Sequence, residues 1–144
     1  MKVAYNACFG GFSLSPLALT AFAKKKGITL YWYTKVDDRK ILAWGEGKLR
    51  RLHRPPKAGG WSTFPLTEDI GEVANNYLET SYYSEPFYEE DRSDPDLIEV
   101  IETLGSLANG MCSNLQIKEI PDGASYEITE YDGYEDVEPP RPDW

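Results

Sequence analysis

The chain has 144 residues, of which 41% are hydrophobic and 27% are charged, and its formal net charge is −9. This length predicts one domain with room for a core, and the ten Tyr and four Trp exclude an intrinsically disordered chain. There is no run of roughly 18 apolar residues and no basic-then-apolar leader. We therefore expect no membrane span, no secretory signal and a cytoplasmic location.

The charges are divided unevenly along the chain. Residues 1–67 hold 12 Lys/Arg and 3 Asp/Glu, whereas residues 68–144 hold 3 Lys/Arg and 21 Asp/Glu. Such asymmetry indicates either a charged partner or attraction between the two halves within one fold. Because the basic half is too small to neutralise the acidic half, we expect much of the acidic surface to stay exposed.

The first third of the chain predicts a strand, a helix and a second strand. The first strand covers residues 2–6, and Ser15 followed by Pro16 is typical of a capped helix start. Three lysines and then Gly27 predict the end of this helix. Residues 28–34 are rich in β-branched and aromatic side chains and predict the second strand. This order suggests a βαβ or split βαβ unit.

The middle of the chain is less regular. A turn at residues 36–40 leads into a predicted return strand at 41–44, and a basic run at 48–57 is expected to open into a loop. Helical spacing predicts a short helix over residues 68–79. An edge strand is expected from Phe87, because proline is tolerated at sheet edges.

A locally consistent stretch begins at Arg92. Asp94 and Pro95 predict a capped helix start, and the Asn109-Gly110 pair predicts the helix end. Beyond this helix we expect antiparallel strands with clear turn signals.

The C-terminal strands follow from alternation and turn chemistry. One strand is expected at residues 115–120 and another at 125–131. Asp132-Gly133 is typical of a type I′ hairpin turn and predicts a return strand at residues 134–137.

Together these elements predict a single compact α+β domain over residues 1–137. Its mixed or antiparallel sheet would contain five to six strands, with two main helices on one face. Residues 138–144 are expected to form a proline-rich tail.

Two sets of short motifs resemble a group of small proteins encoded by tailed bacteriophages. The first is Tyr5-Asn6-Ala7-Cys8-Phe9-Gly10-Gly11-Phe12-Ser13-Leu14-Ser15. The second comprises Arg92-x-Asp94-Pro95-x-Leu97, Glu102-x-Leu104-Gly105, Ala108-Asn109-Gly110, Glu119-Ile120-Pro121-Asp122 and Glu130-Tyr131-Asp132-Gly133. The resemblance covers roughly half of the chain and implies a phage or prophage origin, hence the host cytoplasm, but no particular activity. Residues 35–91 lie outside it and are expected to be an insertion that varies within the group.

The connection between the first strand and the first helix is a candidate ligand site. Two glycines let the backbone approach a ligand, and free amides at a helix N-terminus favour an anion such as a phosphate. The alternative is a tight structural turn, since the chain has neither a Walker pattern nor G-x-G-x-x-G. The candidate residues are Asn6, Gly10, Gly11, Ser13 and Ser15.

The basic run is a second candidate site for phosphates. Arg50, Arg51 and Arg54 could hold a nucleotide there. Nearby aromatic side chains that could stack on a base are Trp44, Trp61 and Phe64. Direct nucleic-acid binding is disfavoured, because a chain of net charge −9 is repelled by a phosphate backbone. The alternatives are a solvated loop and a loop docked on the acidic half.

An acidic, tyrosine-rich stretch is the candidate surface for a protein partner. Carboxylates in a row can imitate phosphates and occupy the positive groove of a nucleic-acid enzyme, and tyrosines among them suit an interface. The alternative is a plain solubilising face. The candidate residues are Tyr82, Tyr83, Glu85, Tyr88, Glu89, Glu90 and Asp91.

No motif assigns a catalytic residue, a metal site or a cofactor. A Cys8–His53 pair could be built on paper, but nothing in the spacing supports it. We expect a non-enzymatic phage accessory protein that inhibits a host anti-phage defence component, by binding a host protein or by sequestering a nucleotide signal. A small enzyme using Cys8 or clustered carboxylates is the alternative, and a homo-oligomer is left open.

Overall fold

The computed structural model describes residues 1–35, 48–57, 63–75 and 92–140. In chain order the elements are β1 (Lys2–Asn6), α1 (Pro16–Lys25), β2 (Tyr31–Lys35), β3 (Lys48–Leu52), β4 (Thr63–Leu66), β5 (Val73–Asn75), α2 (Pro95–Leu104), the short 3-10 helix η3 (Gly105–Ala108), β6 (Leu115–Glu119), β7 (Glu127–Tyr131) and β8 (Tyr134–Glu138). The expected α+β class is confirmed.

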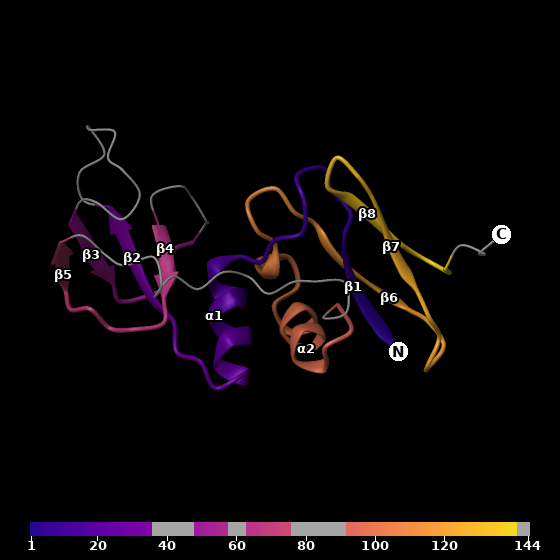
Figure 1. Ribbon diagram of the computed structural model, residues 1–144, viewed down its shortest axis with the longest axis horizontal. Helices are drawn as coiled ribbons and strands as arrows, with labels where there is room; N and C mark the ends of the chain where they lie inside the picture. The colour runs from indigo at the N-terminus through magenta and orange to yellow at the C-terminus, as the bar shows by residue number, and fades with distance from the viewer. Residues whose placement is uncertain (36–47, 58–62, 76–91, 141–144) are drawn as a thin grey trace.

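The described strands form three small sheets. A four-stranded sheet has the order β4-β2-β3-β5, and the pairs β1-β6 and β7-β8 make the other two. All of these pairings are antiparallel. The two helices stand between the four-stranded sheet and the two strand pairs (Figure 1).

This arrangement differs from the expected single sheet of five to six strands with both helices on one face. β1 pairs with β6 from the acidic half, whereas β2 joins β3 and β4, so the suggested βαβ unit does not form. The reason is that apolar side chains of α1 pack both against β2 and against α2. Phe22 belongs to the same buried cluster as Trp32 of β2 and Ile101 of α2, so the helix separates β2 from β1.

Helix α1 begins and ends as its sequence predicts. The Ser15 hydroxyl caps it by accepting from the Ala18 amide at 3.2 Å, and Pro16 fills the first helical position. On its outward side, the Trp32 indole donates to the Thr20 hydroxyl at 2.8 Å. This bond and the apolar contacts beside it attach the four-stranded sheet to the helix.

Helix α2 starts as predicted but ends one turn earlier. Asp94 caps it by accepting from the Asp96 amide at 2.8 Å. The α-helix stops at Leu104 because Gly105 adopts a φ of 58°, and η3 carries the chain on to Ala108. The expected stop at Asn109 therefore marks the end of η3.

Two expectations for the middle of the chain are wrong. The basic run begins as strand β3 rather than as a loop, because Leu49 is buried in the smaller core between its polar neighbours. Over residues 68–75 the predicted helix is replaced by a turn and strand β5, since Asp69 accepts from the Gly71 amide at 3.0 Å and closes a local turn. Residues 76–79 of that prediction lie outside the described residues. The predicted elements at 36–44 and from Phe87 lie outside the described residues.

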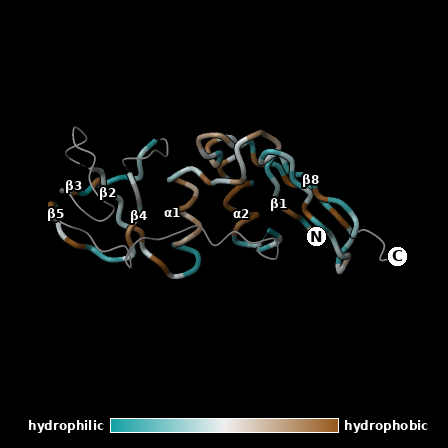
Figure 2. The backbone as a smooth tube through the Cα atoms, turned by 45° about the horizontal axis from the view of Figure 1, so that its top comes forward, coloured by the Kyte–Doolittle hydropathy of each residue, from teal (hydrophilic) through white to brown (hydrophobic). Residues whose placement is uncertain are grey.

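Two hydrophobic clusters hold the elements together. The larger one takes residues from β1, α1, β2, α2 and β6, and the smaller one joins Tyr33, Leu49 and Leu66 within the four-stranded sheet. Figure 2 shows tan to brown hydrophobic stretches on α1 and α2 in the middle of the molecule. Burial of these helix faces supplies the main attraction between the two halves of the fold.

Lysines of α1 and acids of α2 add a second attraction across the same interface. Lys26 lies 2.7 Å from an Asp94 oxygen and 3.0 Å from an Asp96 oxygen, and Lys25 lies 3.0 Å from Glu99. Part of the sequence's charge asymmetry is thus satisfied inside the fold. For Asp94, burial opposes ionisation, but bonds from Lys26 and the Asp96 amide outweigh it, so the pKa of Asp94 lies below its ordinary value.

Asp94→Asn should flatten the acid dependence of stability while keeping a good helix cap. Because the folded pKa of Asp94 is lowered, its stabilisation is present above the ordinary value of about 3.9 and is lost as pH falls through the folded value. We expect the variant to be less stable than wild type at pH 7 and to lose less stability on acidification. Urea unfolding between about pH 7 and 2.5 measures this. Asp132→Asn is the control and should keep the wild-type slope.

The β7-β8 turn is confirmed as type I′, with φ of 51° at Asp132 and 85° at Gly133. A side-chain carbon on Gly133 would collide with the backbone nitrogen of Gly11, because the loop after β1 lies directly against this turn. Gly123 also has a positive φ, of 76°, but nothing lies near its side-chain position. A substitution at Gly123 therefore tests backbone strain alone, whereas one at Gly133 tests strain and steric contact together.

Gly133→Ala should destabilise the protein by at least about 2 kcal/mol more than Gly123→Ala. Both changes carry the strain of a positive φ, roughly 1 kcal/mol, but only the first forces two loops apart. Chemical denaturation of the two variants measures the difference. Equal destabilisation would show that the loops do not rely on this contact.

Candidate functional site

The loops that follow β1 and η3 meet the β7-β8 turn at one buried amide. The Asn6 side chain donates to the carbonyls of Cys8 at 2.7 Å and Gly133 at 2.8 Å. Its own oxygen accepts from the Asn114 amide at 2.8 Å. With all three bonds made and no exposed surface, Asn6 acts as a structural bridge rather than as a ligand contact.

Next to this amide lies a buried ion pair between the start of the α2 segment and β8. The Arg92 guanidinium donates twice to the Glu135 carboxylate, at 2.7 and 2.9 Å. The same carboxylate also accepts from the backbone amide of Asn6 at 2.9 Å. The guanidinium carbon lies 3.9 Å from the centre of the Phe12 ring. The Arg92 carbonyl accepts from the Ala4 amide at 2.8 Å. This pair joins β1, β8 and the entry to α2.

Several polar groups of the turn predicted to bind an anion are engaged within the protein. The Gly10 amide donates to the Asp132 carbonyl at 3.0 Å, and the Ser13 carbonyl accepts from Gly110 at 3.1 Å. The Ser15 hydroxyl donates to the Leu107 carbonyl at 2.6 Å as well as capping α1. The geometry therefore gives this turn a structural role, and Gly11 closes it against Gly133.

The three predicted arginines do not act on one face. Arg50 and Arg51 are neighbours on β3 and point to opposite sides of the sheet. Arg51 and Arg54 line a cavity of about 240 Å3, whereas Arg50 does not. The Asn6–Ser15 turn belongs to the other side of the helices from β3, so the structure does not bring the two predicted phosphate sites together (Figure 1).

Sequence reasoning missed the aromatic side chains of this cavity. Tyr31 and Trp32 line it, because β2 pairs with β3. Tyr31 lies beside Arg51, and Trp32 lies opposite Leu52. Trp44 and Trp61, predicted to stack there, lie outside the described residues, as does the side chain of Phe64. The Tyr-Trp-Tyr run of β2 was the available signal, but its pairing partner was not visible in the sequence.

The predicted partner surface at residues 82–91 lies outside the described residues. The β7-β8 hairpin, which is described, also combines acidic side chains with tyrosines. In this hairpin the two residues of each cross-strand pair point to the same side of the sheet. Three pairs point to the outer side: Tyr131 with Tyr134, Thr129 with Asp136, and Glu127 with Glu138. Glu135 and Val137 point the opposite way, into the protein.

Exposed aromatic rings occupy the turn end of this outer side. Tyr131 is 76% exposed, Tyr134 43% and Phe9 60%. The Phe9 and Tyr134 rings are in contact, with centroids 5.5 Å apart. We call these three rings, together with Glu127, Asp136 and Glu138, the hairpin face.

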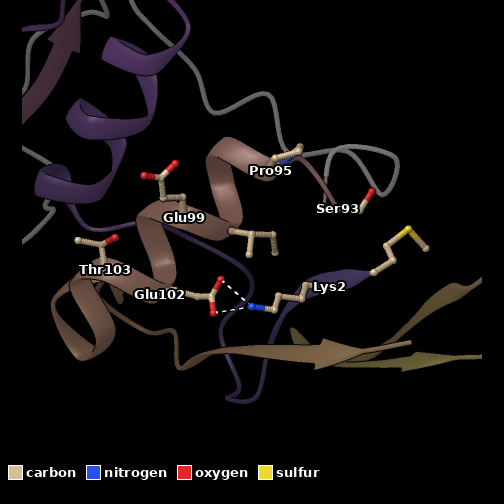
Figure 3. Close-up of a pocket in the computed structure, with 8 residues that line it drawn as sticks. Lys2, Ser93, Pro95, Glu99, Glu102 and Thr103 are labelled. Carbon is tan, nitrogen blue, oxygen red and sulfur yellow. Dashed lines mark hydrogen bonds and ion pairs between the residues drawn. The ribbon is translucent and has the colours of Figure 1, made fainter. Parts of the chain in front are cut away.

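A larger groove of about 590 Å3 lies between the N-terminus and α2. Its floor includes Met1, Pro95 and Ile98. Figure 3 shows Lys2 from β1 and Glu102 from α2 reaching toward each other across it, at 2.9 and 3.2 Å. The Lys2 ammonium and the Glu102 carboxylate of this groove are therefore already paired with each other.

The described residues do not assemble a catalytic or metal constellation. Cys8 lies in the loop after β1, whereas His53 follows β3 and contacts Glu72 at 3.0 Å, so the two are not brought together. No group of three or more metal-ligating side chains occurs within residues 1–35, 48–57, 63–75 and 92–140. Among the helices of this described part, none is long and apolar enough to cross a bilayer.

Comparisons with known proteins return no relatives. The sequence matches no family model, and neither a curated protein nor a solved structure resembles it closely enough to count as a match.

Arg92→Met should destabilise the protein by about 3–5 kcal/mol, because it leaves Glu135 buried without its partner. Lys2→Met is the control; it breaks a half-exposed pair and should cost much less. Equilibrium unfolding in urea measures both. If Arg92→Met costs no more than the control, the buried pair does not hold the hairpin.

Proposed function

We propose that this protein acts by binding a protein partner that carries a basic surface, and that the hairpin face makes the contact. The observation that carries the proposal is the contiguous group of exposed rings, Phe9, Tyr131 and Tyr134, beside a row of carboxylates on the same strands. Large exposed aromatic side chains are uncommon on surfaces that only face water, and they are enriched in interfaces.

The two kinds of side chain on this face would have separate roles. Tyrosine rings bury much area at low entropic cost and anchor interfaces. Carboxylates attract a positive partner and orient its approach, which raises the association rate. The net charge of −9 extends this attraction beyond the contact area.

The hairpin is also well supported from behind. Glu135, on its inner side, is held by Arg92 and by the Asn6 amide, so the outer side is fixed before any partner arrives. A fixed face loses less entropy on binding than a mobile one. This supports binding through the hairpin rather than a purely solubilising role.

The biological setting in this proposal comes from the resemblance to phage proteins. On that basis the partner is a host component of anti-phage defence in the host cytoplasm, and binding inhibits it. A positively charged nucleic-acid groove is the partner surface that a row of carboxylates would fit. The enzyme alternative has weaker support, since Cys8 and His53 lie on different sheets' loops.

The test compares a face variant with a matched control. Tyr131→Ser combined with Tyr134→Ser removes two rings, whereas Val73→Ser removes a 58% exposed apolar side chain from β5, in the other sheet. A partner is first captured from bacterial host lysate, purified, and its Kd measured by surface plasmon resonance at two salt concentrations. We expect the double variant to weaken binding at least about tenfold and Val73→Ser to leave it unchanged.

Salt dependence separates this interface from a generic apolar contact. Glu127→Gln combined with Glu138→Gln should slow association and reduce its dependence on ionic strength. An acidic partner, a salt-independent association rate, or equal losses in the tyrosine variant and Val73→Ser would each overturn the proposal.

A further inference from the structure

We propose that the cavity at the ends of strands β2 and β3, beside α1, binds a small ligand that carries both a phosphate and a planar ring, of the nucleoside monophosphate class. This site is separate from the hairpin face and does not depend on it. Its lining combines aromatic side chains with basic ones, notably Tyr31, Trp32, Arg51, His53 and Arg54.

The basic side chains of the cavity differ in whether they already have a partner in the described part of the protein. Arg51 is ion-paired with Asp69 at 2.7 Å, and His53 contacts Glu72 at 3.0 Å. Arg54 is exposed and has no ion-pair partner within the part of the chain that the structure describes. A guanidinium in this position is suited to bind a phosphate through two parallel hydrogen bonds.

The flat groups of the cavity suit a ring. The Arg51 guanidinium carbon lies 4.9 Å from the centre of the Tyr31 ring, and Asp69 holds the same guanidinium from another side. Because the group is fixed in orientation, a second ring can stack on this arginine–tyrosine unit without ordering a mobile side chain. Pro55 adds another flat surface to the lining.

A hydroxyl suited to a sugar also borders the cavity. Thr20 is already engaged, since it donates to the Pro16 carbonyl and accepts from the Trp32 indole. Thr29 is exposed and has no hydrogen-bond partner among the described residues. It can therefore bond a ligand hydroxyl without breaking an internal contact.

Size and charge narrow the ligand class. The volume of about 240 Å3 lies below the roughly 300–1,000 Å3 usual for ligand pockets, so the cavity encloses at most part of a nucleoside monophosphate and is too small for a dinucleotide. The basic run also makes this end locally positive in a chain of net charge −9. A local positive field attracts a small anion, although the whole molecule repels long polyanions such as DNA.

Isothermal titration calorimetry with AMP, GMP, adenosine and inorganic phosphate tests the proposal. We expect a nucleotide to bind more tightly than adenosine or phosphate alone, because only it supplies both ring and phosphate. Arg54→Gln should weaken nucleotide binding at least about tenfold. Arg50→Gln is the matched control, since it removes the same charge from a β3 residue that does not line the cavity and should leave the affinity unchanged.

Three results would overturn the proposal. One is the absence of measurable heat and of any nucleotide-dependent rise in Tm with the intact protein. Another is equal affinity for inorganic phosphate and AMP, which would reveal general anion attraction. The third is an equal loss in Arg54→Gln and Arg50→Gln, which would place the effect in overall charge rather than in the cavity.

Discussion

The buried pair between Arg92 and Glu135 is the interaction on which the arrangement of the second half depends. A carboxylate removed from water is costly unless its oxygens are bonded, and here they accept from the guanidinium twice and from the Asn6 amide. The pair fixes β8 against β1 and fixes where the chain enters α2. The hairpin face, the loop after β1 and the helix cap all take their positions from it.

This pair also gives a physical meaning to the two sets of short motifs in the sequence, residues 5–15 and residues 92–133. Asn6, Arg92, Gly110 and Gly133 are far apart in sequence, yet they belong to loops that close on one another. The motifs therefore describe a folded junction rather than a binding pocket. The two candidate binding surfaces lie elsewhere. The exposed rings of the hairpin lie beside this junction, and the cavity beside β3 lies away from it.

The charge asymmetry of the sequence is resolved in two ways. Lysines of α1 meet acids of α2 at the helix interface, which consumes part of both surpluses. The remaining surpluses separate in space: β3 carries basic side chains at one end of the long axis, and the β7-β8 hairpin carries acidic ones at the other (Figure 1).

The sequence by itself determined the features set by local chemistry: both helix starts, the type I′ turn and the strands β1, β6 and β8. Serine, aspartate and proline at helix starts act within one turn, so no distant contact is needed to read them. Only the tertiary structure decided that the strands divide into three sheets, since pairing joins residues more than a hundred positions apart. It also decided that residues 48–52 form a strand with Leu49 buried, and a strand points neighbours such as Arg50 and Arg51 to opposite sides.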